Sequence, residues 1–274
     1  MSFNWINPED FSINSILLMD RWILQQLVGL GDSQRYDTDG KYRKLLGVVL
    51  AYNPAVYWCF INKSPESAGR VEELVANAPK NLSPEEIRKS EIEFLGMIDS
   101  FIVYLYPDVM NANCPYIRDW DEEKLLSIVD FTDKVVLDIG SGTGRLAFAA
   151  ATKAKKVYAS EPADRLREFM RDKIVREEIS NVVVLDGTIE AIPFEDNTFD
   201  IVMSACVLGL DYDKEIANLE RVAKNGGYII DCMGEDDRKR NKPNEHLLNA
   251  GFQWSHYISK NGGDVYRYWK KVVK

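Results

Sequence analysis

A glycine-rich turn, which joins a hydrophobic run to a helical pattern, holds the residues of this chain best suited to binding a ligand. Residues 135–144 read VVLDIGSGTG, and a helical pattern continues from Arg145 to Ala151. This order predicts a buried parallel strand, a tight turn and a helix start. Glycine lets a ligand approach the backbone closely, and the first turn of a helix offers free N–H groups. A turn without a ligand would leave two of the three glycines unexplained.

The spacing of these glycines separates two kinds of nucleoside ligand. A dinucleotide site requires G-x-G-x-x-G, whose third glycine lets the helix pack closely on the strand. Here the loop reads GSGTG, and Arg145 stands where the third glycine is needed. The stretch VVLDIGSGTG instead resembles the first motif of class I S-adenosylmethionine-dependent methyltransferases. The resemblance implies that the loop bends around the methionine end of S-adenosylmethionine, and that the residues which bind it are Asp138, Gly140, Ser141, Gly142 and Gly144.

The resemblance continues at the end of the second predicted strand. Glu161 and Pro162 follow residues 156–160, and Glu161 lies 17 residues after Gly144. A carboxylate at this place can accept hydrogen bonds from both ribose hydroxyls, and Pro162 is expected beside the cofactor with it. Dinucleotide folds share this spacing, and a surface glutamate is the alternative interpretation. Glu161 therefore supports a nucleoside ligand without choosing between the two kinds.

A third stretch is expected to frame the adenine ring. Residues 185–194 read LDGTIEAIPF, and residues 196–202 read DNTFDIV. They resemble the small-molecule branch of the family that is labelled methyltransferase type 11, which implies that Gly187, Thr188 and Ile189 contact adenine. Thr188 stands where the family usually has Asp, so its hydrogen bond to the adenine amine is uncharged and weaker. We expect Ile189 to contribute at least as much, through packing and its backbone N–H.

The end of the fourth predicted strand departs from the family pattern. Residues 204–210 read SACVLGL, with Gly209 where the family often has a histidine. The resemblance implies that Ser204 and Ala205 line the cofactor near its sulfonium. The missing histidine removes an obvious general base, so no catalytic residue is assigned. Cys206 is interpreted as a packed thiol, because direct methyl transfer needs no nucleophile on the protein.

A short aromatic segment precedes the motifs. Residues 116–120 read YIRDW. In enzymes of this family a segment here commonly folds over the cofactor, so Arg118 is expected to pair with the methionine carboxylate. Tyr116 or Trp120 would then cover the sulfonium, where a cation meets an aromatic face. Ordinary packing and a surface salt bridge are the alternative for this segment.

Two kinds of pattern divide the chain. Up to residue 130, apolar residues recur at helical spacing, with a capping box at residues 83–86 and a proline that opens a helix after Ser64. The helices predicted here cover residues 13–28, 41–52, a third that opens at 64–66, 84–106 and 121–129. From residue 134, strands and helices alternate, which implies a parallel sheet with right-handed crossovers. Strands are predicted at residues 134–139, 156–160, 182–185, 199–204, 227–233, 252–258 and 264–271, and helices at 144–152, 163–176, 213–223 and 243–250.

The C-terminal end breaks this alternation. Residues 261–263 read NGG between the last two predicted strands, which predicts a hairpin. A dehydrogenase-type sheet would be parallel throughout, whereas a methyltransferase sheet includes an antiparallel strand. We therefore predict an α/β fold with a Rossmann-like, mostly parallel seven-stranded sheet, an antiparallel C-terminal hairpin strand and an N-terminal helical cap. The predicted domains are the cap at residues 1–115 and a class I methyltransferase core at residues 116–274.

Composition and charge narrow the partners. The 274 residues are 46% hydrophobic with a net charge of −9, and residues 1–130 carry −8 of it, with 12 basic and 20 acidic residues. Nucleic acid requires a basic face and is not expected as a partner. No apolar run approaches the roughly 20 residues of a membrane span, and no signal peptide is evident, so we expect a cytoplasmic protein without a membrane partner. Four scattered cysteines and two histidines favour reduced thiols and no metal site.

These observations predict an S-adenosylmethionine-dependent methyltransferase that acts on a small-molecule acceptor. The helical cap is expected to shape the acceptor pocket, and a homodimer is left open. One alternative is an adaptor that binds the cofactor without catalysis and whose acidic cap holds a partner protein. The weaker alternative is a nicotinamide-dependent oxidoreductase, against which Arg145 and the C-terminal hairpin argue.

Overall fold

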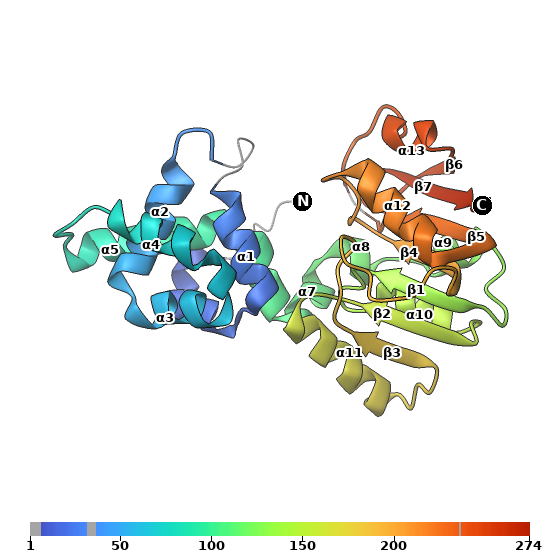
Figure 1. Ribbon diagram of the computed structural model, residues 1–274, viewed down its shortest axis with the longest axis horizontal. Coiled ribbons are helices and arrows are strands. Elements are labelled where there is room, and N and C mark those ends of the chain that lie inside the picture. The colour runs from blue at the N-terminus through green and yellow to red at the C-terminus, as the bar shows by residue number, and fades with distance from the viewer. Residues whose placement is uncertain (1–6, 32–36, 236) are drawn as a thin grey trace. The chain divides into compact units, whose positions relative to one another are not determined.

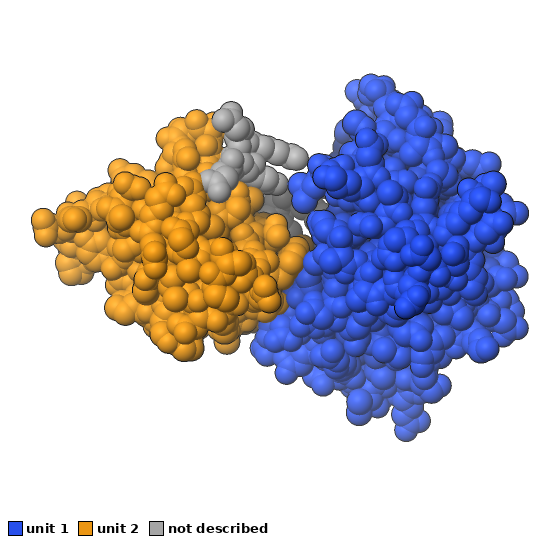
Figure 2. All heavy atoms as spheres, in the orientation of Figure 1, with its two compact units in different colours: residues 1, 107–274 blue, residues 2–106 orange. Residues whose placement is uncertain are grey.

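The computed structural model describes residues 7–31, 37–235 and 237–274. Two compact units divide the chain between Tyr106 and Pro107 (Figure 2). The first unit contains helices, and the second contains the central sheet. Each unit is described by itself.

The first unit is helical throughout its described residues, as the periodicity predicts. Its elements are η1 (Pro8–Asp10), η2 (Ile13–Leu18), α1 (Arg21–Leu30), α2 (Lys41–Tyr52), α3 (Pro54–Lys63), η3 (Pro65–Ser67), α4 (Ala68–Ala76), α5 (Pro84–Met97), α6 (Asp99–Ile102) and η4 (Val103–Leu105). Helix α2 packs against α4 and α5 (Figure 1). A Cβ at Gly47 of α2 would lie 2.8 Å from the Leu74 carbonyl oxygen of α4, so glycine permits this close approach. The fully buried side chains include Leu46, Phe60 and Phe94.

Three helix boundaries differ from the predicted ones. The helix expected at residues 13–28 is broken, because the Asp20 carboxylate accepts the Ile23 N–H at 3.0 Å and starts α1 anew. Helix α3 was not predicted, since Pro54 reads as a stop signal although it also fits the first helical position. The predicted capping box at Ser83 is confirmed, but α5 ends at Met97 rather than near residue 106.

The second unit is built around one mixed sheet, which confirms the predicted fold (Figure 1). Three short helices come first, α7 (Pro107–Asn113), α8 (Pro115–Arg118) and α9 (Glu123–Leu126). The alternating region then contains β1 (Val135–Ile139), α10 (Arg145–Ala151), β2 (Lys156–Ser160), α11 (Asp164–Arg176), β3 (Val182–Leu185), β4 (Phe199–Ser204), α12 (Tyr212–Val222), β5 (Ala223–Cys232), α13 (Glu245–Asn249), β6 (Gln253–Ile258) and β7 (Asp264–Lys271). The strand order is β3-β2-β1-β4-β5-β7-β6, parallel except that β7 runs antiparallel to β5 and β6.

Each face of the sheet carries its own hydrophobic core. Helices α9, α10 and α11 cover one face, where Met203 and Ile230 of the sheet are fully buried. Helices α12 and α13 cover the other face, above Val202 and Ile229. Neighbouring residues of a strand point to opposite faces of the sheet, and helices cover both faces. Consecutive positions of the strands are therefore apolar. Within the described residues no single helix is long and apolar enough to cross a membrane, although α2 and α3 pass that test together as a pair bent by 105°.

Candidate functional site

The strand register gathers the predicted site residues at one edge of the sheet. Ile139 at the end of β1 pairs with Ser160 of β2 and with Ser204 of β4, and Ser204 pairs with Asp231 of β5. The segments that follow β1, β2 and β4 therefore begin side by side. This carboxyl end of the sheet is where open α/β folds bind their ligands.

The loop after β1 has a conformation that glycine adopts readily. Gly140, Gly142 and Gly144 have φ values of 67°, 60° and 89°. An added Cβ at Gly140 would collide with Val207, and one at Gly144 would collide with Phe148, whereas one at Gly142 meets nothing within 4 Å. Two of the glycines are thus required by packing within the protein, and Gly142 presents open space to a ligand.

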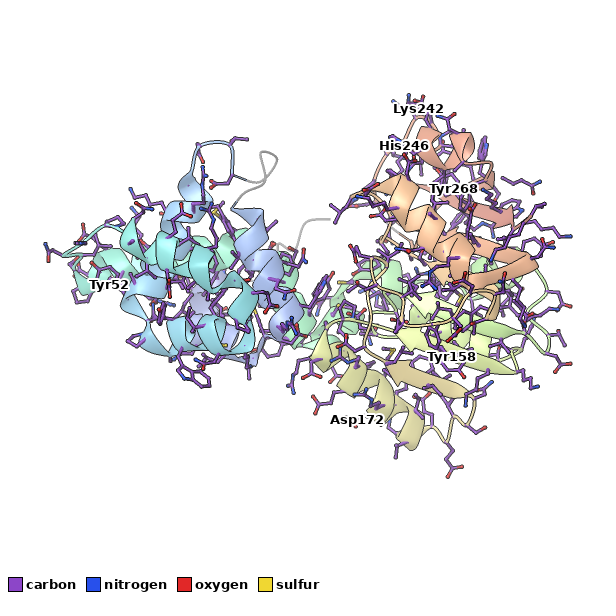
Figure 3. The ribbon with its side chains drawn as sticks, in the orientation of Figure 1. Tyr52, Tyr158, Asp172, Lys242, His246 and Tyr268 are labelled. Carbon is purple, nitrogen blue, oxygen red and sulfur yellow. The ribbon has the colours of Figure 1, made fainter. Side chains whose placement is uncertain are left out.

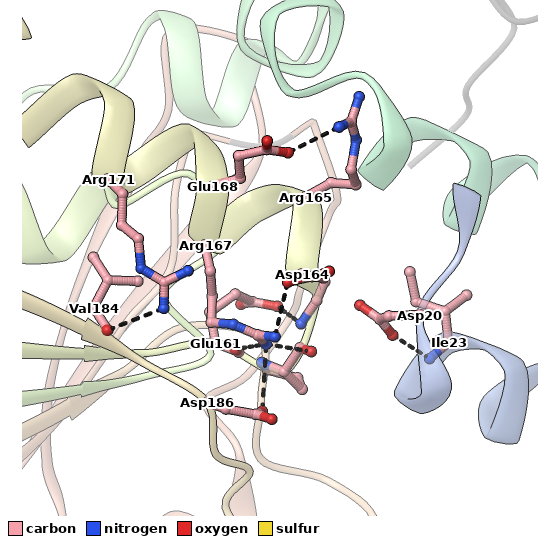
Figure 4. Close-up of polar contacts among 12 residues, drawn as sticks. Asp20, Ile23, Glu161, Asp164, Arg165, Arg167, Glu168, Arg171, Val184 and Asp186 are labelled. Carbon is pink, nitrogen blue, oxygen red and sulfur yellow. Dashed lines mark hydrogen bonds and ion pairs between the residues drawn. The ribbon is translucent and has the colours of Figure 1, made fainter. Parts of the chain in front are cut away.

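Glu161 holds this loop in place. Its side chain is buried, one carboxylate oxygen accepts the Gly142 N–H at 2.8 Å, and the other accepts the Ala163 N–H at 2.8 Å. The Arg167 guanidinium donates to the carbonyl oxygens of Glu161 and Pro162 at 2.7 and 2.6 Å, and also binds Asp186 (Figure 4). These contacts fix both the side chain and the backbone at the end of β2. The role of Glu161 toward the ribose hydroxyls stays a prediction.

Asp138 and Arg145 form a buried polar pair behind the loop. Asp138 is 1% exposed, one of its carboxylate oxygens has no hydrogen-bond partner among the described residues, and burial raises its pKa to about 7. Arg145 donates to the Cys232 carbonyl at 2.9 Å and stacks on the Trp120 ring, 4.3 Å from its centre. The residue that excludes a dinucleotide motif therefore links α10 to the end of β5.

A second buried acid lies across the sheet from Asp138. The Ser204 hydroxyl donates to the Asp231 carboxylate at 3.2 Å, and both side chains are buried. Burial raises the pKa of Asp231 to about 6, although the Ser204 hydroxyl and the Arg145 charge oppose the shift. The sequence indicated Ser204 but not Asp231, whose only signal was its place at the end of a predicted strand.

The loop after β3 is fastened to β2. The Ser160 hydroxyl donates to the Gly187 carbonyl at 3.1 Å, and a Cβ at Gly187 would lie 2.6 Å from that hydroxyl oxygen. Ile189 is 3% exposed, and its carbonyl accepts the Asn218 amide at 3.0 Å. Thr188 is half-buried and forms an isolated bridge with Ala191. The Ile189 side chain is therefore part of the core beneath the loop, and its role toward adenine stays a prediction.

The aromatic segment before β1 is ordered by local contacts. Arg118 forms two hydrogen bonds with the Asp119 carboxylate, at 2.9 and 2.8 Å, and a third with the Ala112 carbonyl. Arg118 thus takes part in the surface salt bridge that was its alternative interpretation, and a role toward the methionine carboxylate stays a prediction. Tyr116 is half-buried, and its backbone contacts Gly234 after β5 closely enough to exclude a Cβ there. The buried indole N–H of Trp120 has no partner among the described residues.

Tyr212, the first residue of α12, follows the loop after β4. The Tyr212 hydroxyl accepts the Asn244 amide at 2.6 Å, and its ring stacks on His246 at 4.6 Å with an interplanar angle of 4°. His246 lies on α13 (Figure 3). A Cβ at Gly209 would lie 3.7 Å from that hydroxyl, so Tyr212 lies beside the place of the missing histidine. Ala205 is half-buried, whereas Cys206 is exposed with φ of 60°, so its interpretation as a packed thiol is wrong.

The donor and acceptor groups at this edge fit S-adenosylmethionine. The open side of Gly142 leaves room for the cofactor next to a fixed carboxylate on Glu161. Behind the loop, one acceptor oxygen of Asp138 and one guanidinium nitrogen of Arg145 have no hydrogen-bond partner within the described part of the chain. An amino-acid zwitterion needs one group of each kind.

A comparison with protein families agrees with this geometry. The family model described as a methyltransferase domain matches residues 137–231. Residues 137–231 are therefore a methyltransferase domain. The match begins in β1, ends at Asp231 and contains the glycine loop, Glu161 and Ser204. The helical unit lies outside it.

The chain is similar to several curated methyltransferases over part of its length. It is 36% identical over 123 residues to an uncharacterized methyltransferase of Schizosaccharomyces pombe, a match that covers 41% of this chain and 43% of the relative. It is 37% identical over 153 residues to the ubiquinone/menaquinone biosynthesis C-methyltransferase UbiE of Idiomarina loihiensis, covering 51% and 59%. The chain thus spans about half the length of these two relatives. A solved S-adenosylmethionine-dependent methyltransferase from Aquifex aeolicus superposes with a TM-score of 0.48 at 22% identity, covering 61% of this chain and 98% of that one.

Proposed function

We propose that this chain is an S-adenosylmethionine-dependent methyltransferase with a small-molecule acceptor. The observation that carries the proposal is the open side of Gly142 next to the buried carboxylate of Glu161, at the edge where β1, β2 and β4 end. No side chain fills the space beside Gly142. The positive φ of Gly142 and the carboxylate fixed next to it therefore do not serve to complete the hydrophobic core.

The protein itself contributes little covalent chemistry to the proposed reaction. The cofactor supplies a methyl group activated by the sulfonium, and an acceptor atom displaces it in line. The chain aligns the two reactants and excludes water, which accounts for much of the rate in reactions of this kind. Glu161 would hold the adenosyl part through its ribose, while Gly142, Asp138 and Arg145 would hold the methionine end.

For the acceptor, we propose an electron-rich aromatic ring. Relatives of this chain include proteins named ubiquinone/menaquinone biosynthesis C-methyltransferase and demethylmenaquinone methyltransferase. At the end of β4, the stacked Tyr212 and His246 and the exposed Leu210 offer an apolar and aromatic surface. The Tyr212 hydroxyl accepts a hydrogen bond from Asn244, so its own proton can be donated to a ring oxygen.

We further assign part of the acceptor specificity to the helical unit as a cap. Within the described residues of this unit, Trp58 is 60% exposed and Leu18 is 48% exposed. Exposed apolar side chains of this size are suited to contact a lipophilic acceptor. Substitution of Trp58 by Ser should therefore change the Michaelis constant of the acceptor and leave the affinity for cofactor unchanged.

The test is a binding and turnover experiment on the full chain. Calorimetry with S-adenosylhomocysteine should give a saturable heat, and 100 times the dissociation constant should stabilise the protein by about 2.7 kcal/mol. NAD should give neither signal, and binding of NAD alone would refute the proposal. Methyl transfer from labelled S-adenosylmethionine to demethylated hydroquinones is then expected. Cofactor binding without transfer to any acceptor in a broad panel would support the adaptor alternative.

A further inference from the structure

The buried charges at the carboxyl end of the sheet do not balance. Three buried carboxylates, Asp138, Glu161 and Asp231, lie there with two half-buried guanidinium groups, those of Arg145 and Arg167. Glu161 accepts two backbone N–H groups, and Asp231 accepts the Ser204 hydroxyl. With these five groups ionised, three negative charges face two positive ones, which leaves a surplus of one negative charge. A cationic ligand group would compensate it, because charges interact strongly where water is excluded.

Among the three buried acids, Asp231 is the one hydrogen-bonded to Ser204, the residue expected to line the cofactor near its sulfonium. It lies on β5 opposite Ser204 of β4, and the two are joined by a hydrogen bond of 3.2 Å. Ser204 is the last residue of its strand, and its side chain is fully buried. Among the described residues, the hydrogen bond of the Asp231 carboxylate is to the Ser204 hydroxyl and not to a backbone N–H of the glycine loop, so its charge is not needed to hold that loop.

Resting on the proposed function, we propose that Asp231, acting through Ser204, makes the site selective for the cationic cofactor over the neutral product. S-adenosylmethionine carries a sulfonium charge, and S-adenosylhomocysteine has an uncharged thioether at the same place. The carboxylate attracts only the charged form, so transfer of the methyl group weakens the hold on the cofactor. Asp231 is thus a specificity-determining residue that promotes exchange of product for fresh cofactor.

The surroundings of Asp231 set the pH range in which this selectivity operates. Arg145 on α10 favours the ionised form, while Tyr268 on β7 and the Cys232 thiol are the adjacent titratable groups. Asp138 lies near Arg145 on the β1 side, and the buried Glu235 accepts the Lys260 N–H in the segment after β5. Burial raises the pKa of Asp231 to about 6, so its charge is present at pH 8 and largely absent at pH 5.

The experiment compares the dissociation constants of S-adenosylmethionine and S-adenosylhomocysteine by calorimetry. At pH 8 the preference for S-adenosylmethionine should fall about fivefold in Asp231→Asn, as expected for the loss of one screened charge interaction, and the fall should come from weaker binding of the cation. Asp200→Asn is the matched control. Asp200 lies on β4 at the opposite edge of the sheet, where it accepts the Val135 N–H at 2.9 Å. Loss of the Asp200 charge should leave the preference for S-adenosylmethionine over S-adenosylhomocysteine unchanged.

A second measurement needs no substitution. The preference of the wild-type protein should fall between pH 8 and pH 5, and Asp231→Asn should show a smaller fall, which reports Asp138. An equal preference in wild type and Asp231→Asn at pH 8 overturns the inference, as does a wild-type preference that is constant with pH. If neither ligand binds the wild-type protein, the proposed function itself is wrong.

Discussion

The two ends of the central sheet treat carboxyl groups in opposite ways. At the carboxyl end, burial raises the pKa of Asp138 to about 7 and that of Asp231 to about 6. At the amino end, burial of Asp200 is outweighed by the Val135 N–H and the Lys224 ammonium, which together lower its pKa. The ionised form of aspartate is therefore stabilised at the amino end of the sheet. At the carboxyl end, the ionised form is held at a cost in stability. That cost marks the end at which a ligand is expected.

A groove of about 670 Å³ lies at the amino end, bordered by Lys134, Lys224, Asp200 and Trp269. Two pairs of polar groups along it are Asp200 with Lys224, and the Trp269 indole, which donates to Gln253. At the carboxyl end, buried polar atoms of Asp138 and Arg145 lack partners among the described residues. The unsatisfied buried groups therefore favour the carboxyl end as the place for a ligand.

The sharpest test of this contrast uses two glycines. Gly142 and Gly226 lie at opposite ends of the sheet, have φ of 60° and 81°, and would each place a Cβ in open space. Substitution of either by Val should cost about 1–3 kcal/mol of folding free energy through backbone strain. Gly142→Val should in addition lower the affinity for S-adenosylhomocysteine more than about 100-fold, a loss of about 2.7 kcal/mol or more. Gly226→Val should bind normally. Equal binding by both variants in calorimetry would remove the glycine loop from the site.

The next test concerns stability and pH. Because the native pKa of Asp138 is raised, the folded protein binds more protons than the unfolded chain between about pH 4 and pH 7. The stability contributed by Asp138 is therefore present at low pH and lost as the pH rises through this window, by up to about 4 kcal/mol. Asp138→Asn should unfold at higher urea than wild type at pH 8. Asp200→Asn should unfold at lower urea, because it loses an ionised and well-paired group. A stabilised Asp200→Asn at pH 8 would contradict the contrast.

The smallest expected effects rank two residues within the carboxyl end. Glu161→Ala should weaken the binding of S-adenosylhomocysteine by about 1.5–3 kcal/mol for each charged hydrogen bond lost. Thr188→Ala removes an uncharged group and should cost about 0.5–1.5 kcal/mol. Calorimetric titration of both variants measures the order directly. The reverse order would show that the adenosine pocket is misassigned.

Much of the sheet unit was predictable because its signals are local. Four strands match their predicted residues, at 156–160, 182–185, 199–204 and 264–271, since each is a short apolar run between turn residues. The contacts of Arg145 with Cys232 and Trp120 were not predictable. The glycine spacing shows that the loop does not fit a dinucleotide motif, but it does not show where the Arg145 guanidinium lies. The Asp231 to Ser204 contact depends on the register of two strands whose residues lie 27 positions apart. No local pattern contains that information.

The helical unit was harder to predict for a different reason. Its composition indicates helices, but the breaks at Asp20 and Ile98 depend on side-chain capping and tertiary packing. Pro54 is compatible with both the end of one helix and the start of another, so α3 was overlooked. Its exposed Trp58 could not be told from a core residue by spacing alone.

Glu161 has a consequence for the thermodynamics of ligand capture. Its carboxylate already accepts two backbone N–H groups, one of them from Gly142, so the loop is preorganised before any cofactor arrives. Association then needs little loss of conformational entropy from this part of the chain. Differences in affinity among adenosyl ligands should therefore appear mainly as differences in their residence times, rather than in how fast they enter the site.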